Sequence, residues 1–299
     1  MTKDSIEHLA EIARMNQSNR MLLPDGTSLP RIGQGTWNMG DDASRREEEI
    51  AALRLGVELG MNLIDTAEMY GDGRSELLVG EAIKGIRDQV FLVSKVYPHN
   101  AGNERLIRSC EESLKRLNTD HLDLYLLHWR GDIPLEETVV GMEKLVSQGK
   151  IARWGVSNFD VDDMKELLGI AGGTHCATNQ ILYHLGSRGI ETELLPWQRS
   201  HKIPVMAYSP LAQAGSLRKG VIESEVVQEI ASAHNATPLQ IMLAWTMREE
   251  DIISIPKASS REHVIENAAA GLITLSKDEI WKLDEAFPIP SWKVPLDMI

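Results

Sequence analysis

Residues 61–76 read MNLIDTAEMYGDGRSE, and this stretch decides the fold. A short apolar run ends in Asp65, Tyr70 follows it, and a Gly-Asp-Gly turn comes next. A carboxylate at the end of a buried strand is costly unless it is paired or takes part in chemistry. Two later apolar runs end in the same way, VFLVSK in Lys95 and LDLYLLH in His128. The pattern predicts parallel strands whose carboxyl ends meet at one site.

Short apolar runs alternate with longer stretches of helical periodicity along most of the chain. Eight runs are predicted to be strands, at residues 31–35, 61–65, 90–95, 122–128, 151–157, 176–180, 203–208 and 252–256. Helices are predicted between them and after the last, at residues 44–60, 75–86, 103–117, 135–148, 160–170, 189–201, 223–234 and 261–270. A further helix is predicted over 238–248, because Pro238 suits the first turn of a helix.

Eight strand–helix units in a chain of 299 residues predict an α/β fold of the (β/α)8 TIM barrel type. The alternative is a doubly wound sheet with a glycine-rich first turn, but GQGTWN at 33–38 lacks the third glycine of G-x-G-x-x-G. Residues 1–20 are expected to be an extension, either a short helix or disordered. Residues 21–299 are expected to form one barrel domain, with a hairpin at Asp25-Gly26 and a C-terminal helix and tail.

Two segments show no regular periodicity, residues 209–222 after the seventh strand and the proline-broken tail at 288–299. Both are long enough to form covers over a site at the strand ends. They are therefore expected to be irregular loops.

The composition fits a cytoplasmic protein that acts on small molecules. The formal net charge of −13 argues against a nucleic-acid or anionic membrane partner. Two cysteines indicate neither a disulfide framework nor a structural zinc site. No run reaches the roughly 18 apolar residues of a membrane span, and residues 1–20 lack the apolar core of a signal peptide.

The side chains at the carboxyl ends of the second, third and fourth predicted strands suit proton transfer by a tyrosine. A phenol titrates near pH 10, so Tyr70 is a weak acid at neutral pH. Lys95 is expected to lower the pKa of Tyr70, and Asp65 to hold Lys95 charged and fixed. His128 is expected to hydrogen-bond the reacting oxygen and orient it. These four residues predict general acid catalysis.

The later strand ends have a different character. Ser157-Asn158 and Asn179-Gln180 offer neutral hydroxyl and amide groups, which suit a neutral amide ligand. Tyr208 offers a face on which a flat ring can stack. Lys257, followed by serines at the start of a helix, suits a phosphate. A carboxamide ring and phosphates together describe a nicotinamide nucleotide.

The chain resembles the aldo-keto reductases from about residue 21 to residue 287. The motifs that carry the resemblance are LPDGTSLPRIGQGTW, DTAEMYGDGRSELLVGEAI, VFLVSKV, DLYLLHW, GVSNF, the pairs Asn179-Gln180 and Tyr183-His184, AYSPL and IPKASSREHVIEN. The resemblance implies a (β/α)8 barrel, capped at its base by the hairpin, that binds NADP(H) without a Rossmann fold. It implies reduction of aldehydes and ketones to alcohols by hydride transfer.

The resemblance also implies a role for individual residues. Tyr70 would be the proton donor, and Asp65, Lys95 and His128 would complete the set of four catalytic residues. The substrate pocket would be formed by Trp37, Tyr70, His128 and Trp129. The cofactor would be held by Thr36, Trp37, Asp65, Ser157, Asn158, Gln180, Tyr208, Ser209, Pro210, Leu211, Ile255, Pro256, Lys257, Ala258, Ser259, His263, Glu266 and Asn267. No metal is implied.

Two departures from the family pattern affect specificity. Many members that prefer NADP(H) carry arginine six residues after the lysine of strand eight, where this chain has His263, and the nearest arginine is Arg261. NADP(H) is the expected cofactor, and use of NAD(H) is possible. The short tail, which has little aromatic content besides Trp292, suggests an open pocket and broad specificity. The protein is expected to be a monomer or a weak homo-oligomer.

Two other functions are compatible with a barrel. A nucleotide-binding regulatory subunit would sense the redox state of the cofactor without turnover, but the four catalytic residues speak against it. A metal-dependent hydrolase would show clustered histidine and aspartate ligands at the strand ends, where only His128 of nine histidines lies. The physiological carbonyl substrate is not predicted.

Overall fold

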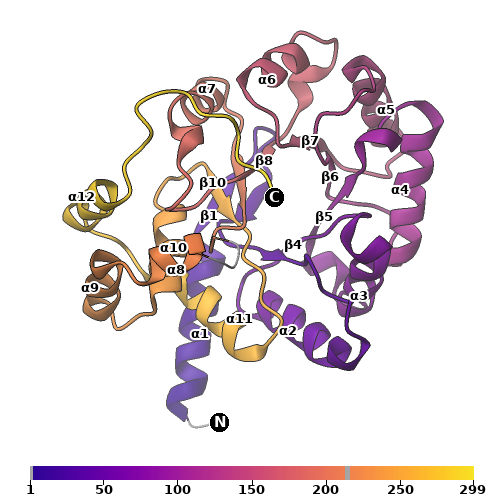
Figure 1. The fold of residues 1–299 in the computed structure, drawn as a ribbon. Coiled ribbons are helices and arrows are strands. Elements are labelled where there is room, and N and C mark those ends of the chain that lie inside the picture. Colours follow the sequence, from indigo (N-terminus) through magenta and orange to yellow (C-terminus); the bar gives the residue numbers. More distant parts are fainter. Residues whose placement is uncertain (1–2, 213–215) are drawn as a thin grey trace.

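Eight parallel strands run side by side in the order in which they occur in the chain. In this computed structural model, which describes residues 3–212 and 216–299, helices surround the strands in a ring (Figure 1). The strands are β3 (Gln34–Gly35), β4 (Leu63–Asp65), β5 (Phe91–Val96), β6 (Leu124–Leu127), β7 (Trp154–Ser157), β8 (Asn179–Leu182), β9 (Val205–Tyr208) and β10 (Ile252–Ser254). Each predicted strand is present, and most are shorter than predicted; β5 is shifted by one residue, and β8 begins later and ends two residues later than predicted.

The two edge strands of this sheet approach one another. Parallel bridges join Ile32 to Ser254 and Gly35 to Lys257, next to β3 and β10. A doubly wound sheet would reverse its strand order part of the way across, whereas this order is consecutive. The strands and helices therefore match the (β/α)8 arrangement and not the doubly wound alternative.

Twelve α-helices are present in the described residues. They are α1 (Lys3–Ser18), α2 (Arg46–Glu58), α3 (Arg74–Ala82), α4 (Asn103–Leu117), α5 (Leu135–Ser147), α6 (Val161–Leu168), α7 (Leu194–Ser200), α8 (Ser216–Ile222), α9 (Glu225–Ala233), α10 (Pro238–Thr246), α11 (Arg261–Ala269) and α12 (Lys277–Ala286). Short 3₁₀ helices are η1 (Ala43–Arg45), η2 (Tyr70–Gly73), η3 (Arg87–Gln89), η4 (Pro98–Asn100), η5 (Gly173–His175), η6 (Gly189–Glu191) and η7 (Ala270–Leu272).

Segment 209–222 was expected to be irregular, and this prediction is wrong for its second half. Residues 216–222 form α8, and residues 213–215 lie outside the described part of the chain. Glycine, serine and two basic residues hide the helical pattern there. The tail at 288–299 is irregular, as expected.

A hairpin seals the end of the barrel opposite the predicted site. Its strands are β1 (Arg20–Leu22) and β2 (Ser28–Pro30), which pair in antiparallel fashion. Buried Met21 and Leu29 belong to the same apolar cluster as Leu63 and Phe91, the first residues of β4 and β5. The hairpin therefore covers the amino ends of the strands and leaves their carboxyl ends to the site.

The helices bury one face each against the sheet. In α4 the buried residues include Leu106, Cys110, Leu114 and Leu117, which recur every three to four positions. Burial raises the pKa of Cys110 to about 12, and it does the same for Cys176. Both thiols are therefore protonated and unreactive parts of the core.

Helix α1 is ordered and packs onto the barrel, although it extends away from the rest of the molecule in Figure 1. Ile12 is fully buried in a cluster with residues of α2 and α11. Buried Asn16 donates from Nδ2 to the carbonyl oxygens of Leu59 (2.9 Å) and Ala268 (3.0 Å). One side chain thus links the carboxyl ends of α2 and α11.

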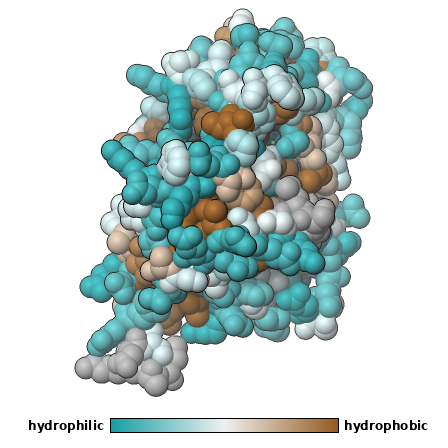
Figure 2. All heavy atoms as spheres, turned by 60° about the vertical axis from the view of Figure 1, so that its left-hand side comes forward, coloured by the Kyte–Doolittle hydropathy of each residue, from teal (hydrophilic) through white to brown (hydrophobic). Residues whose placement is uncertain are grey.

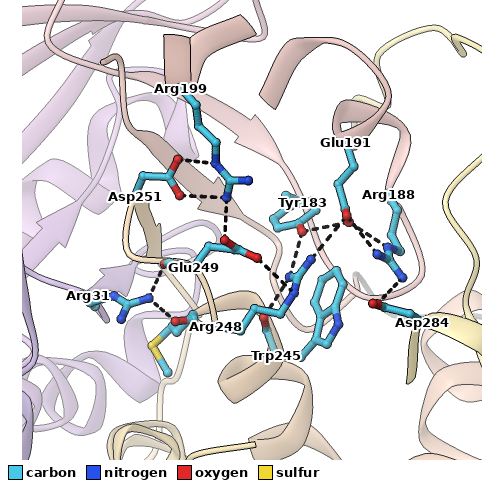
Figure 3. A network of polar contacts seen from close by, with 11 residues as sticks. Arg31, Tyr183, Arg188, Glu191, Arg199, Trp245, Arg248, Glu249, Asp251 and Asp284 are labelled. Carbon is cyan, nitrogen blue, oxygen red and sulfur yellow. Dashed lines mark hydrogen bonds and ion pairs between the residues drawn. The ribbon is translucent and has the colours of Figure 1, made fainter. Parts of the chain in front are cut away.

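A polar network joins segments that are distant in the sequence (Figure 3). Glu191 accepts hydrogen bonds from the hydroxyl of Tyr183 (2.9 Å), from Nε of Arg188 (2.7 Å) and from Nη2 of Arg248 (3.3 Å). The guanidinium of Arg248 lies 3.8 Å from the ring centroid of Trp245. The network connects η6 to α10.

The surface carries mixed polarity. On the face drawn in Figure 2, hydrophobic side chains lie in small groups between hydrophilic ones. In the described part of the chain, every helix falls short of the length and apolar content that a bilayer span requires.

Candidate active site

A tight turn follows Tyr70 and keeps this residue close to the carboxyl end of β4. Gly71 (φ 56°), Asp72 (φ 52°) and Gly73 (φ 87°) all have left-handed backbone conformations in η2. Three such residues in succession are accessible because two of them are glycines and aspartate tolerates the conformation better than most residues. The Gly-Asp-Gly sequence therefore folds the chain back between β4 and α3.

Lys95 is fully buried at the centre of the site and uses all three of its donors. Its Nζ donates to Oδ2 of Asp65 (2.7 Å), to the carbonyl oxygen of Thr66 (2.9 Å) and to the hydroxyl oxygen of Tyr70 (3.1 Å). Because the Tyr70 oxygen accepts this hydrogen bond, its own proton is left to face another acceptor.

The charges of this cluster are set by burial and by the ion pair. Burial lowers the pKa of Lys95, but Asp65 and Tyr70 together outweigh it and raise that pKa above its ordinary value. Lys95 therefore stays cationic. For Tyr70, burial raises the pKa, and the opposing effect of Lys95 is smaller. Lys95 lowers the pKa of Tyr70, as expected, but desolvation of the phenolate is the larger effect, and the net pKa is raised above its ordinary value.

His128 lies beside Tyr70 immediately after β6. The two ring centroids are 5.8 Å apart with the planes nearly perpendicular. Burial, with a contribution from Lys95, lowers the pKa of His128 to about 2. The imidazole is therefore neutral, and it can offer a hydrogen bond without carrying a labile extra proton.

The neutral groups expected at the ends of β7 and β8 form a connected set. Asn158 is left-handed (φ 59°), and its Nδ2 donates to the carbonyl oxygen of His128 (3.1 Å). The hydroxyl of Tyr208 donates to Oδ1 of Asn158 (2.9 Å). Gln180 donates from Nε2 to Oδ1 of Asp65 (2.8 Å). This last bond joins the amide groups to the Lys95 cluster.

Asn179, the neighbour of Gln180, does not lie with this set. Its Nδ2 donates to the carbonyl oxygen of Phe159 and to Oε1 of Gln198, both on the helical side of the sheet. Successive residues of a strand point to opposite faces, so only one of the two amides reaches the strand-end site.

A cavity of about 530 Å³ occupies the carboxyl ends of the strands. It is lined by all the residues named above for cofactor and substrate, and by Tyr70 and His128, while Lys95 lies buried behind it. Lining residues that the sequence did not suggest are Gly35, Asn38, Met69, Ala212, Arg218, Leu239, Met298 and Ile299. The structure therefore brings the predicted residues together, although lining a cavity does not by itself assign their roles.

The last residues of the chain reach this cavity. In Figure 1 the tail runs from α12 across the ring, and its end lies over the strands. Ser187 donates a short hydrogen bond to Asp297, and Nζ of Lys293 lies 2.9 Å from Oε2 of Glu193. Met298 and Ile299 then line the cavity, so a short tail does not leave this pocket uncovered.

The cavity carries positive charge at the end formed by β10 and α11. The hydroxyl oxygen of Ser259 lies 3.1 Å from Nζ of Lys257 and 3.0 Å from Nη2 of Arg45, the last residue of η1. Arg45 and Arg261 are both absent from the residues that line the cavity, but Arg45 is linked to it through the hydroxyl of Ser259, which does line it. Arg45 gave no signal in the sequence, because an arginine in DASRREEE resembles the charged start of an exposed helix.

Comparison with known proteins agrees with this geometry. The sequence model of the Aldo/keto reductase family matches residues 31–287. Methylglyoxal reductase YeaE of Escherichia coli (strain K12) is 60% identical over 272 residues, which cover 91% of this chain and 96% of that protein. Methylglyoxal reductase DkgA of the same organism is 33% identical over 273 residues, covering 88% and 92%.

A solved structure shows the same arrangement of the chain. It is the crystal structure of an aldo/keto reductase from Klebsiella pneumoniae in complex with NADP and acetate. It is 55% identical in sequence, covers 94% of this chain and 99% of its own, and superposes with a TM-score of 0.92.

Proposed function

Because the chain belongs to the aldo/keto reductase family, we propose that it reduces small aldehydes and ketones to alcohols with NADPH. Methylglyoxal, the substrate named for the two Escherichia coli relatives, is the first candidate. The observation that carries the proposal is the buried Asp65–Lys95–Tyr70 chain, which opens onto a cavity beside a neutral histidine.

In this proposal Tyr70 gives its proton to the carbonyl oxygen. The phenol is protonated at neutral pH because its pKa is raised by burial. As the proton leaves, the phenolate forms against the ammonium of Lys95, 3.1 Å away, which stabilises the new charge. His128 is neutral, and it would orient the carbonyl oxygen by a hydrogen bond.

The residues of the cavity fit a nicotinamide cofactor. When bound, NADPH supplies a hydride for the carbonyl carbon. Ser157, Asn158 and Gln180 would hold the carboxamide, and Tyr208 would stack on the ring. Lys257 and Ser259 would meet the adenosine end, where the cavity is cationic. The distribution of neutral amides and cations matches the two ends of that molecule.

The substrate would enter between aromatic side chains. Trp37 is 39% exposed and lines the cavity together with Trp129, whose ring lies 4.9 Å from that of His128. We take residues 21–299 as the catalytic domain, on which α1 is an added element. Small carbonyl compounds fit this site best, because the tail end occupies part of its mouth.

The test is cofactor oxidation with methylglyoxal or 4-nitrobenzaldehyde by the wild type and by Tyr70→Phe. We expect the variant to bind NADPH normally and to lose two or more orders of magnitude in kcat, about what general acid catalysis contributes. Tyr97→Phe is the matched control, because it removes a hydroxyl from a ring next to Trp129 but outside the lining of the cavity. Near wild-type turnover by Tyr70→Phe would refute the assigned mechanism.

A further inference from the structure

Two cations from opposite ends of the chain converge on one hydroxyl. Lys257 follows β10, and Arg45 ends η1, 214 residues from Ser259 in sequence. Both donate to Oγ of Ser259, at 3.1 Å and 3.0 Å. Ser259 is 8% exposed and lines the cavity together with Lys257, and Arg45, which does not itself line the cavity, reaches its wall through the Ser259 hydroxyl.

The carboxylates near these cations do not neutralise both of them. Glu48 lies 3.5 Å from Nε of Arg45 in a half-exposed pair of the kind that contributes little stability. The carboxylate of Glu49 is buried and accepts from the backbone N–H of Gly40 (2.9 Å). In the described part of the chain, Lys257 has a hydroxyl rather than a carboxylate as its polar partner.

The pKa of Lys257 reflects its burial and the charged groups around it. Partial burial lowers its pKa, Glu49 opposes this effect, and Arg45 adds to it. Two like charges that share a hydroxyl repel each other, and an anion placed between them would remove that repulsion. The arrangement therefore has the properties of an anion site before any ligand binds.

Helix α11 begins at the same place. Its N-cap Ser260 accepts from the backbone N–H of His263 (3.4 Å), and His263 lines the cavity. The amino end of a nine-residue helix adds partial positive charge to that of the two side chains. A site for the free 2′-hydroxyl of NAD characteristically presents a carboxylate. Here the lining carboxylate of α11 is Glu266, one helical turn beyond His263, whereas the polar groups gathered around the Ser259 hydroxyl are those of Lys257 and Arg45.

We propose that Arg45 is a specificity-determining residue that contacts the 2′-phosphate of NADPH, together with Lys257 and Ser259. The guanidinium would come from the segment between β3 and α2 and not from α11, where the chain has His263. This inference rests on the proposed use of a nicotinamide nucleotide, and it explains how NADP(H) is preferred without an arginine at position 263.

The experiment measures binding and not turnover. Dissociation constants for NADPH, NADH, 2′-AMP and 5′-AMP are measured for the wild type, Arg45→Gln and Arg45→Lys, by tryptophan fluorescence or calorimetry. Arg46→Gln is the matched control, because it removes the same charge from the adjacent residue, which pairs with Glu81 instead (2.7 Å). Thermal midpoints of all variants show whether each one is folded.

We expect Arg45→Gln to weaken NADPH and 2′-AMP binding about tenfold or more, the size of a lost charge-assisted hydrogen bond. NADH and 5′-AMP should bind as before, Arg45→Lys should recover part of the loss, and Arg46→Gln should change nothing. Equal weakening of NADPH and NADH, or no change in either, would overturn the inference.

The outcomes separate this inference from the proposed function. If the wild type binds neither nucleotide, the proposed function fails, and Arg45 loses its ligand with it. If the wild type oxidises both nucleotides in the presence of methylglyoxal and binds them equally, the function stands and the role of Arg45 is refuted. A preference for NADPH that Arg45→Gln abolishes supports both.

Discussion

At the scale of single residues, burial sets the protonation states on which the chemistry depends. The pKa of His128 is lowered to about 2 by burial and by Lys95, and the pKa of Tyr70 is raised by burial. The proposed mechanism requires a protonated phenol on Tyr70 and a neutral imidazole on His128. Both conditions hold across the ordinary pH range, since an unperturbed histidine titrates near pH 6.5 and a tyrosine near pH 10.

The pH profile of reduction should therefore be level. We expect kcat/KM for 4-nitrobenzaldehyde to stay constant between about pH 5.5 and about pH 8.5, and to fall only as Tyr70 loses its proton at higher pH. Initial rates of NADPH oxidation in a buffer of constant ionic strength provide the measurement. A step in the profile between about pH 6 and about pH 7 would show that His128 titrates in the working enzyme.

At the scale of elements, α1 is expected to stabilise the barrel through one side chain. Asn16→Ala leaves the buried carbonyl oxygen of Leu59 without its side-chain donor, at about 1–3 kcal/mol, and that of Ala268 with the N–H of Ala270 as its remaining donor, at a smaller cost. The variant also removes the buried Oδ1 of Asn16, which lacks a partner among the described residues, so the net loss should be about 2 kcal/mol.

Differential scanning calorimetry measures this loss as a lower thermal midpoint. A decrease of several degrees is expected, at about 2–4 °C for each kcal/mol in a chain of this size class. Ser18→Ala is the control on the same helix, because its hydroxyl is exposed and bonds only within α1. Equal midpoints for the two variants would mean that Asn16 does not connect α2 and α11 in solution.

The elements that the sequence predicts well are those with a local signal. Helix α4 has the predicted bounds, because its apolar residues recur at helical spacing from Leu106 to Leu117. Asp65, Lys95 and His128 were found because each ends an apolar run, and parallel strands bring such ends together. Arg45 and α8 were missed, because a contact across 214 residues and a helix of mixed composition leave no local pattern.

At the scale of the whole molecule, the network in Figure 3 should make stability depend on pH. Burial raises the pKa of Glu191, but the hydrogen bond from Arg188 and the charge of Arg248 outweigh it, and the net pKa is lowered. A carboxyl with a lowered folded pKa stabilises the fold above its unfolded pKa of about 4.3. That stability is lost as pH falls through the folded pKa.

Glu191→Gln should therefore be clearly less stable than the wild type at pH 7, because two buried guanidinium groups lose the carboxylate that they share, and Arg188 keeps only Asp284 and Arg248 only Glu249. The difference between the two thermal midpoints should shrink as the pH falls from about 5 to about 3. Glu166→Gln, which removes a half-exposed carboxylate 3.0 Å from Arg130, is the control and should show little difference at either pH. A constant difference for Glu191→Gln would contradict the assigned ionisation.

The barrel as a whole follows from the alternation of strand and helix patterns in the sequence. The polar network around Glu191 does not. Arg248 is 65 positions from its partner Tyr183, and no periodicity relates the two residues. The length of the C-terminal tail also does not predict how far it covers the pocket, since Ile299, its last residue, lines the cavity. Long-range polar contacts and chain ends depend on the finished packing, which local patterns do not encode.

The two buried thiols have a practical consequence for spectroscopy. Cys110 and Cys176 lie within the core with their pKa raised to about 12, so maleimide dyes and spin labels should leave them unmodified while the protein is folded. A single cysteine introduced on the exposed face of α8, at Lys219, would then accept a label selectively. A label at that one position would report on the mobility of α8, without first removing the protein's own cysteines.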